Sequence, residues 1–269
     1  MSAGVDVVVV TYNSRTHLPG AAAAVRALGE VTSVTVFDNA SVDDTPALAR
    51  TLAWGAPTDV VASARNLGFG AACNAAVRSV ADPAPYVLLL NPDASVPEGG
   101  LARLVADLDA DPALGCVGAR LTRPSGEPVS SARYFPTWRS VAARRAQDVE
   151  HRGALVEADW VCGALMLWRR EAFDGVGGFA DAYFLYYEDT DICRRAADLG
   201  WRTAVDGRVH ATHDQGHGLR TPAHLRRHSR RSRRRYALRW LGWRGALAVA
   251  VADAAELAGA SLRAIGLRR

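Results

Sequence analysis

The chain contains no lysine, because all 32 of its basic residues are arginine. Its four cysteines are widely spaced and form no C-x-x-C pair, so we expect reduced thiols rather than disulfides or structural zinc. No apolar stretch reaches the roughly 18 residues of a membrane span. Asp6 interrupts the apolar N-terminal run, which indicates a strand rather than a signal peptide. With 49% hydrophobic residues among 269, the chain is expected to be a globular, cytoplasmic protein.

The common phosphate-binding motifs are missing too. No G-x-G-x-x-G follows the first apolar run, and no Gly-Lys-Ser/Thr occurs, which excludes the usual dinucleotide fingerprint and the P-loop. A glycine pair does occur at Asn66-Leu-Gly68-Phe-Gly70. It is either part of a phosphate-binding turn or a tight strand-to-helix turn, since glycine serves both.

Apolar runs separated by Ala-rich helical stretches predict a parallel sheet covered on both faces, and hence an α/β fold. The predicted strands are Val5–Val10, Val34–Phe37, Val60–Ala62 and Tyr86–Leu90. In such sheets, ligands bind beyond the carboxyl ends of the strands. Polar groups follow all four of these strands: Tyr12-Asn13, Asp38-Asn-Ala-Ser41, Arg65-Asn66 and Asn91-Pro-Asp93.

The second half of the chain is less regular. We expect a helix at Gly99–Leu108, strands at Cys116–Leu121, Trp160–Trp168 and Arg202–Val205, and a helix at Glu188–Leu199 closed by Gly200. The irregular stretch 124–138 is a candidate lid or acceptor loop. The strand at Arg202–Val205 leads into a group of histidines, His210, His213 and His217, which are either structural or ligands of a metal or phosphate.

Three acids follow a run of aromatic residues near the second helix. Glu188, Asp189 and Asp191 repel one another directly behind Tyr183-Phe-Leu-Tyr-Tyr187, so a polar substrate or a metal is expected nearby. Alternatively, Glu188 and Asp189 only complement the dipole at the helix start. Asp93 has two interpretations as well: its carboxylate suits Mg²⁺ or Mn²⁺, but Asn-Pro-Asp is also an ordinary turn.

Sugar transfer from a nucleoside diphosphate would need a nucleobase pocket, a cation for the diphosphate and a carboxylate base. Asp38, Asp93 and either Glu188 or Asp189 are candidates for these tasks. A nucleotidyltransferase is disfavoured, because Thr11-Tyr-Asn-Ser14 replaces the expected Gly-rich loop with its Arg or Lys. A noncatalytic adaptor is disfavoured because both Asp93 and Asp189 are present.

An ordered set of motifs resembles the inverting family-2 glycosyltransferases over about residues 5–217. The set comprises Val8-Val-Val-Thr-Tyr-Asn13, Asp38-Asn-Ala-Ser-Val-Asp43, Asn66-Leu-Gly-Phe-Gly70, Leu89-Leu-Asn-Pro-Asp93, Trp160-Val-Cys-Gly-Ala164, Gly177-Gly-Phe179 and Glu188-Asp-Thr-Asp191. This resemblance implies a GT-A fold with one mostly parallel central sheet. A nucleotide-binding half at about 1–95 would join an acceptor half at 96–217 without a linker, followed by a basic helical tail at 218–269.

The resemblance also implies roles for single residues. Asp189 would be the catalytic base, and Asp93 and His213 would hold a divalent cation, Mg²⁺ or Mn²⁺. Apart from the resemblance, we expect Asp191 and Arg194 to form an internal structural pair. Acceptor-site residues would be Glu188, Trp160 and Gly163. Nucleotide-binding residues would be Thr11, Tyr12, Asn13, Asp38, Arg65 and Asn66. The chain departs from the family's usual metal motif, Asp-x-Asp, because Asn91 replaces the first aspartate of that motif.

Within the family, the Asn-Pro-Asp motif and the aromatic–acidic segment look most like rhamnosyltransferases. The run His213-Asp-Gln-Gly-His217 and the arginines after it are similar to actinobacterial enzymes that act on polyprenyl-diphosphate-linked N-acetylglucosamine. The resemblance implies a nucleoside-diphosphate sugar donor, with dTDP-rhamnose expected. It also implies a lipid-linked or other glycan acceptor in cell-wall or polysaccharide synthesis. UDP- and GDP-sugars on another acceptor remain alternatives.

The tail is strongly basic. Arg220 to Arg239 contains nine arginines, which favour attraction to an anionic bilayer over nucleic-acid binding, since nothing else in the chain resembles a nucleic-acid module. We therefore expect a peripheral protein at the inner face of the plasma membrane. Trp240 to Leu267 is expected to be a helix, either amphipathic at the membrane interface or packed on the domain or on a partner in a homodimer.

Overall fold

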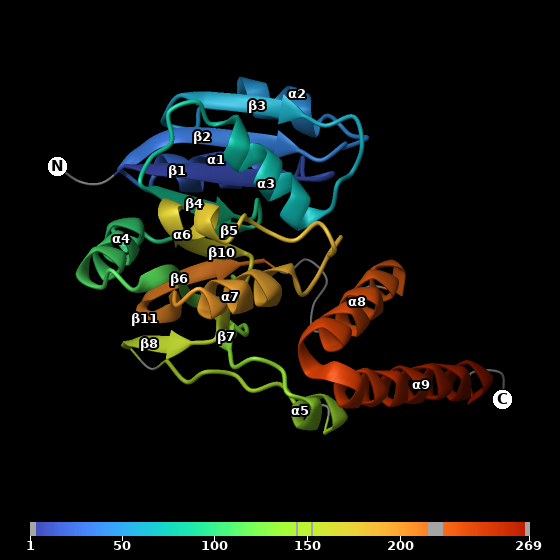
Figure 1. Cartoon of the computed structure of the whole chain (residues 1–269). Coiled ribbons are helices and arrows are strands. Elements are labelled where there is room, and N and C mark those ends of the chain that lie inside the picture. Colours follow the sequence, from blue (N-terminus) through green and yellow to red (C-terminus); the bar gives the residue numbers. More distant parts are fainter. Residues whose placement is uncertain (1–3, 144, 152, 215–222, 267–269) are drawn as a thin grey trace.

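The computed structural model describes residues 4–143, 145–151, 153–214 and 223–266, with side chains through residue 255. Helices and strands alternate through the first half of the chain (Figure 1). The strands are β1 Val5–Thr11, β2 Val31–Asp38, β3 Thr58–Ala62, β4 Tyr86–Leu90, β5 Ala94–Ser95, β6 Leu114–Thr122, β7 Ala132–Arg133, β8 Leu155–Ala158, β9 Trp160–Val161, β10 Leu165–Arg169 and β11 Arg202–His213. The helices are α1 Leu18–Arg26, α2 Thr45–Thr51, α3 Phe69–Ser79, α4 Gly100–Ala110, α5 Trp138–Ala142, α6 Arg170–Gly175, α7 Glu188–Asp198, α8 Ala223–Tyr236, the π-helical turn η1 Ala237–Leu241 and α9 Gly242–Gly266.

In the described part of the chain, nine strands form one sheet. Its path runs β3-β2-β1-β4-β10-β6-β11-β5, and β8 pairs with β11. The strands β1 to β4 are mutually parallel, as are β6 and β11, whereas β10 runs antiparallel between β4 and β6. The sheet therefore crosses from the first half of the chain to the second without a break. This is the GT-A arrangement that the sequence predicts.

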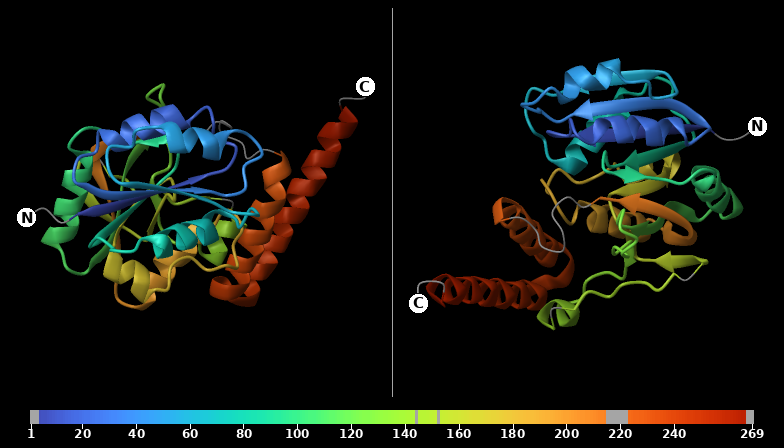
Figure 2. Two further views of the ribbon diagram at one scale, coloured as in Figure 1. Left: turned by 90° about the horizontal axis from the view of Figure 1, so that it is seen from above. Right: turned by 180° about the vertical axis from the view of Figure 1, so that it is seen from behind.

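Helices cover both faces of this sheet (Figure 2). Alternate residues of β1 enter different cores: Val7 and Val9 pack with α1 and α4, whereas Val8 and Val10 pack with α3, α6 and α7. Strands whose side chains are buried on both faces lose their hydrophobic alternation, which explains the continuous apolar runs in the sequence. The carboxyl ends of β1, β2 and β4 are thereby fixed at one edge of the molecule.

Two predicted strands differ in the structure. The strand expected at Trp160–Trp168 is broken into β9 and β10, because Cys162-Gly163-Ala164 forms a turn in which the Leu165 N–H donates to the Cys162 carbonyl at 3.2 Å. The strand expected at Arg202–Val205 continues through a bulge after Asp206 to His213. His210 and His213 thus belong to the strand rather than to a loop after it, and His217 lies outside the described residues.

The C-terminal helices pack against the domain (Figure 1). Tyr236 and Ala237 are buried, and α9 lies along α5. On the other side of α9, Trp243, Leu247 and Val251 are exposed at a helical spacing of four. Among the described residues, no helix is both long and apolar enough to cross a membrane.

Candidate active site

Thr11 and Asp38 meet at the carboxyl ends of β1 and β2. They are register partners, and both are buried. The Asp38 carboxylate accepts hydrogen bonds from the Thr11 hydroxyl at 3.1 Å and from the Ser41 hydroxyl at 2.5 Å and N–H at 3.0 Å. Asp38 is thus held rigidly at the strand end, with its acceptor capacity partly used by its own loop.

The neighbouring loops are tied together by side chains. The Asn13 N–H donates to the Ser41 hydroxyl at 2.8 Å, and the Asn39 amide donates to Asn66 Oδ1 at 3.0 Å. Asn13 itself has a positive φ of 51°, a conformation that asparagine tolerates. The side chains of Tyr12 and Arg65 remain exposed beside this braced edge. The structure therefore gathers all six predicted nucleotide-binding residues at the ends of β1 to β3.

The Gly177-Gly-Phe179 motif joins the two halves of the chain. The Asn74 side chain on α3 accepts from the Phe179 N–H and donates to the Phe179 carbonyl, both at 2.8 Å. Gly68, at φ +85°, lies so close to Phe184 that a Cβ there would come within 2.3 Å of the Phe184 carbonyl oxygen. These contacts fix the loop before α7 against the nucleotide-binding half, and they explain why glycine occupies position 68.

Asp93 and His213 meet although they are distant in sequence. His213 pairs with Ala94 across β11 and β5, which places His213 Nε2 3.4 Å from Asp93 Oδ1. Adjacent ligands of one Mg²⁺ ion lie about 3 Å apart, because each is about 2.1 Å from the metal. The pair thus fits two neighbouring positions on one ion after a small side-chain movement. Among the described residues, no cluster of three such ligands exists, so substrate oxygens and water would fill the remaining positions.

The turn at 162–164 connects this pair to Asp189. The Ala164 carbonyl accepts from the Asn91 N–H at 2.9 Å, while the Gly163 N–H donates to Asp189 Oδ2 at 3.2 Å. Burial, followed by the charge of Asp189 and with a smaller contribution from Asp93, raises the pKa of Cys162 to about 12. Both carboxylates therefore act on the same thiol. Gly163 orients the predicted base, as an acceptor-site position would.

Asp189 is half-buried at the first turn of α7. Its Oδ1 accepts from the Thr190 N–H at 2.7 Å and the Thr190 hydroxyl at 3.3 Å. Burial raises the pKa of Asp189 above its ordinary value, and the hydrogen bonds from Gly163 and Thr190 limit that rise. In the described part of the chain, no arginine forms an ion pair with it. Such a carboxylate is a stronger proton acceptor than one on the surface.

Glu188, the neighbour of Asp189, is more deeply buried and less well hydrogen-bonded. Its side chain is 5% exposed, and Oε2 is buried without a hydrogen-bond partner. Burial, followed by the charge of Asp189, raises the pKa of Glu188 well above its ordinary value. The neutral carboxylic acid is the form that such an environment favours.

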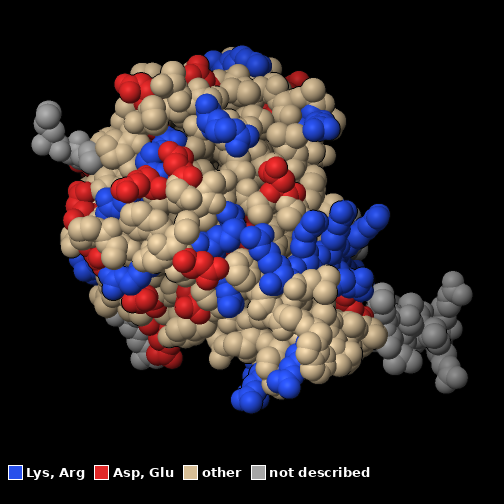
Figure 3. Space-filling view, viewed as in Figure 1, with Lys and Arg blue, Asp and Glu red and all other residues tan. Residues whose placement is uncertain are grey.

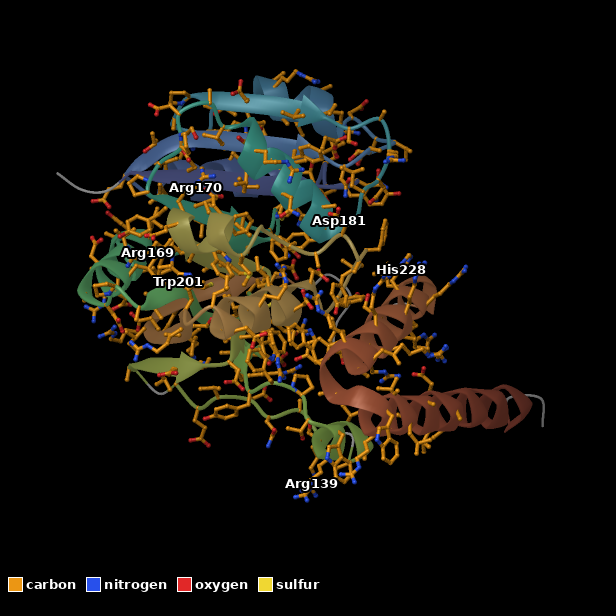
Figure 4. All side chains as sticks on the ribbon, in the orientation of Figure 1. Arg139, Arg169, Arg170, Asp181, Trp201 and His228 are labelled. Carbon is orange, nitrogen blue, oxygen red and sulfur yellow. The ribbon has the colours of Figure 1, made fainter. Side chains whose placement is uncertain are left out.

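Two consecutive tyrosines precede these acids with left-handed backbones. Tyr186 has φ 70° and Tyr187 has φ 69°, a rare conformation for bulky residues that is stable only where the surroundings enforce it. The C-terminal segment supplies those surroundings: the Tyr187 and Tyr236 rings are 5.3 Å apart, and the Ser232 hydroxyl donates to the Leu185 carbonyl at 2.8 Å. On the same helix, His228, which is labelled in Figure 4, stacks on Phe184 with the ring centroids 4.6 Å apart.

Asp191 ties α7 to the tail, and its predicted pairing with Arg194 is wrong. Its Oδ2 accepts from Arg195 at 2.8 Å, while Oδ1 accepts from Trp240 Nε1 at 2.8 Å and the Tyr183 hydroxyl at 3.1 Å. Arg195 also donates to two backbone carbonyls, which fixes it on the side of Asp191. Arg194 points elsewhere, between the rings of Phe135 and Trp240.

A cavity of about 500 Å³ opens beside Asp189. Its walls come from the loop before α7, from β7 and β9, from α5 and from the C-terminal helices. The lining includes Trp160, Tyr186, Tyr187, Glu188 and Asp189, together with Arg133, Arg145, Ser229 and Arg233. The predicted acceptor residues Trp160 and Glu188 thus line one cavity, whereas the contributions of Arg133 and the tail are new. No periodicity or motif marks them, because they reach the cavity only through long-range packing.

Comparison with known proteins gives a consistent picture. A sequence model described as glycosyl transferase family 2 matches residues 6–177. An N-acetylglucosaminyl-diphospho-decaprenol L-rhamnosyltransferase of Mycobacterium tuberculosis is 28% identical, covering 88% of this chain and 85% of that protein. A rhamnosyltransferase of Escherichia coli, WbbL, is 40% identical over 63 residues, 23% of this chain and 24% of that protein.

Solved structures share the fold. A mannosyltransferase of Pyrobaculum calidifontis in complex with GDP-Man and Mn²⁺ superposes with a TM-score of 0.64 at 20% identity, covering all of this chain and 80% of that one. TarS of S. aureus, in complex with UDP-GlcNAc, gives a TM-score of 0.58 at 16% identity, covering 87% of this chain and 66% of that one.

Proposed function

Because this chain belongs to glycosyl transferase family 2, we propose that it transfers L-rhamnose, with inversion, from dTDP-rhamnose to N-acetylglucosamine linked through a diphosphate to a polyprenyl lipid. The similarity to the mycobacterial rhamnosyltransferase over most of both chains supports this acceptor. One geometric observation carries the proposal: the turn at 162–164 touches Asp189 on one side and the Asp93 element on the other. This contact supports a reaction in which Asp189 and the Asp93 element act on the same donor and acceptor.

Asp189 is the catalytic base in this proposal. It takes the proton from the acceptor hydroxyl as that oxygen bonds to the anomeric carbon of the donor, while the bond between that carbon and the diphosphate breaks and the nucleoside diphosphate leaves with the electron pair. The raised pKa of Asp189 suits this task. Thr190 and Gly163 hold the carboxylate in one orientation, so little reorganisation is needed during the reaction.

Asp93 and His213 would hold the divalent cation in this proposal, Mn²⁺ or Mg²⁺. When bound, such an ion neutralises charge on the diphosphate. We expect Asp93→Ala to weaken nucleotide binding in the presence of Mn²⁺ by at least about tenfold, and to leave the weak binding in EDTA unchanged. Titration calorimetry with dTDP would measure both. An equal loss with and without the metal would assign Asp93 a structural role instead.

The nucleoside diphosphate would lie along the strand ends that carry Thr11, Tyr12, Asn13, Asp38, Arg65 and Asn66. Asp38 is rigid and presents a carboxylate to a base N–H, and the exposed Tyr12 ring offers a stacking surface. The decisive experiment offers the protein dTDP-, UDP- and GDP-sugars with a short-chain, water-soluble N-acetylglucosaminyl diphosphate. We expect transfer from dTDP-rhamnose and an inverted anomeric centre in the product by NMR. Efficient transfer from another nucleotide sugar would overturn the donor assignment, and a retained anomeric configuration would overturn the mechanism.

We also propose that the protein works at the membrane surface, where a polyprenyl acceptor lies. Arginines gather on α8 beside the loop before α7 (Figure 3). They line a groove of about 830 Å³, in which Arg227 and Arg231 are exposed and form no ion pair with described residues. Each such arginine contributes about 1 kcal/mol of attraction to an anionic bilayer.

Sedimentation with phosphatidylglycerol vesicles tests this surface. The double variant Arg227→Gln/Arg231→Gln is expected to bind these vesicles roughly 30-fold more weakly, because the two arginines together contribute about 2 kcal/mol. The control Arg50→Gln/Arg78→Gln removes the same charge from exposed positions on α2 and α3 and is expected to bind like the wild type. Equal losses in both variants, equal binding to neutral phosphatidylcholine, or preferential binding to duplex RNA would contradict a specific bilayer site.

A further inference from the structure

The cavity beside Asp189 has an uneven charge distribution. Among the described residues that line it, the acids are Glu188 and Asp189, both from the first turn of α7, and the basic residues are three arginines. These arginines come from separate parts of the chain: Arg133 from β7, Arg145 from the segment after α5, and Arg233 from α8. Convergence of three guanidinium groups on one cavity favours an anionic ligand group in the same cavity as the base.

Arg133 and Arg233 are held in place rather than free to swing. Arg133 Nε donates to Asp148 at 2.8 Å, and its guanidinium lies over the Trp160 ring at 5.7 Å. Arg233 donates to Asp253, a buried residue of α9. Each guanidinium is a planar fork with five N–H donors, so an ion pair at one edge fixes the orientation in which the group lines the cavity.

The remaining walls suit a sugar. Trp160, Tyr186 and Tyr187 present aromatic rings, and the volume of about 500 Å³ is typical of small-ligand pockets. One ligand could therefore place a sugar hydroxyl at Asp189 and an anionic group at the arginines. Arg233, Ser229 and Ala252 belong to the C-terminal helices, beyond residues 6–177 where the family model matches.

We propose that Arg133 and Arg233 bind the diphosphate of the acceptor while its sugar hydroxyl faces Asp189. This inference rests on the proposed function and adds to it a second anion subsite, separate from the one for the donor. It makes the C-terminal helices part of acceptor recognition. Bidentate guanidinium contacts to phosphate oxygens would supply both affinity and orientation.

Steady-state kinetics with two water-soluble acceptors tests the subsite. One acceptor is a short-chain alkyl N-acetylglucosaminyl diphosphate, and the other is the neutral alkyl glycoside of the same sugar. For Arg233→Gln and Arg133→Gln we expect KM for the diphosphate acceptor to rise by roughly 10- to 100-fold, with KM for the neutral acceptor and for the donor unchanged. An alkyl diphosphate should compete with the acceptor in the wild type and lose this inhibition in the variants.

Two further variants make the result specific. Arg233→Lys keeps the charge beside Asp253 but loses the planar fork, so it is expected to fold normally and to show an intermediate KM. Arg244→Gln removes an exposed arginine of α9 that stacks on Trp243, 5.3 Å away, and it should behave like the wild type.

Several outcomes would overturn the subsite. Equal rises of KM for both acceptors would show that the arginines only maintain the cavity shape. A rise confined to the donor would assign them to the donor diphosphate, and unchanged kinetics in the Gln variants would remove the subsite altogether. If the wild type transfers sugar to neither acceptor, the proposed function fails as a whole, which is a separate result.

Discussion

Asp189, at the start of α7, forms no ion pair with a described residue, whereas the buried acids Asp107 of α4 and Asp206 of β11 both bond to Arg208. Asp206 on β11 is fully buried and accepts three hydrogen bonds from Arg208, between 2.7 and 2.9 Å, and Asp107 on α4 accepts another at 2.9 Å. Burial raises the pKa of Asp206, but its hydrogen bonds with Arg208 and the neighbouring Asp107 carboxyl outweigh burial and leave the pKa below its ordinary value. Asp189, in contrast, has only amide and hydroxyl donors.

This difference shows how to distinguish a structural acid from a reactive one. A carboxylate whose guanidinium partners outweigh its burial, as at Asp206, is stabilised in its charged form and is a poor proton acceptor. One that is buried without an ion pair, and open to a cavity, stays basic and accessible. Asp191 is only two residues from Asp189, but it is fully buried and held by Arg195, Trp240 and Tyr183, which gives it a structural role.

The largest expected effect is that of Asp189→Asn. This change removes the proton acceptor and keeps the shape of the side chain, so kcat is expected to fall by roughly 10³-fold. Binding of dTDP, measured by calorimetry, should remain near the wild-type value. In the wild type, kcat/KM should fall on the acid side with a pKa above that of an ordinary aspartate, because burial raises the pKa of Asp189. Near-normal turnover in the variant would remove Asp189 as the base.

A smaller effect is expected when a hydrogen bond that holds the first turn of α7, and with it Asp189, is removed. Trp240→Phe deletes the N–H that donates to Asp191 at 2.8 Å but keeps an aromatic ring beside Arg194. We expect kcat to fall roughly tenfold, as for other residues that orient a reactive group through a neighbour, with unchanged KM for the donor. The control is Trp243→Phe, which alters a 72% exposed side chain on α9.

A purely structural role for Trp240 has a different signature. It would lower the melting temperature without lowering kcat in the fraction that remains folded. Measuring both quantities for the two variants therefore decides whether the tail positions the first turn of α7 or only stabilises the fold.

The sequence predicts the local elements of the site well and the long-range contacts that support them poorly. Periodicity locates the strands, and local composition draws attention to the acids Glu188, Asp189 and Asp191 behind the aromatic run. The choice of Asp189 as the base comes from the family resemblance and stays a prediction. The contacts of Trp240 with Asp191 and of Ser232 with Leu185 span 49 and 47 residues, and no local pattern encodes them. The pairing of Asp191 with Arg195 instead of Arg194 depends on the carbonyls of Val176 and Gly178, which only the folded chain brings there.

The variant Glu188→Gln tests whether Glu188, unlike Asp189, is dispensable as a charged carboxylate. Because burial favours the neutral form of Glu188, the amide matches it in charge and nearly in shape. We expect kcat/KM to stay within about threefold of the wild type, measured beside Asp189→Asn under the same conditions. A loss of a hundredfold or more would mean that Glu188 works as a carboxylate, and the roles of the two acids would then need to be exchanged or shared.

The smallest effect on activity is expected from Asp107→Asn, which tests the buried acids of α4 and β11. Burial, followed by Asp206, raises the pKa of Asp107 to about 6. A raised carboxyl pKa in the folded state stabilises the fold at low pH, and this contribution is lost as pH rises from about 4 through about 6. The asparagine variant lacks that titration. Its melting temperature minus that of the wild type should therefore increase from pH 4 to pH 7, while kcat stays unchanged. A parallel pH dependence of the two melting temperatures would show that Asp107 titrates normally, and a loss of kcat would show that the acids of α4 and β11 are coupled to the cavity after all.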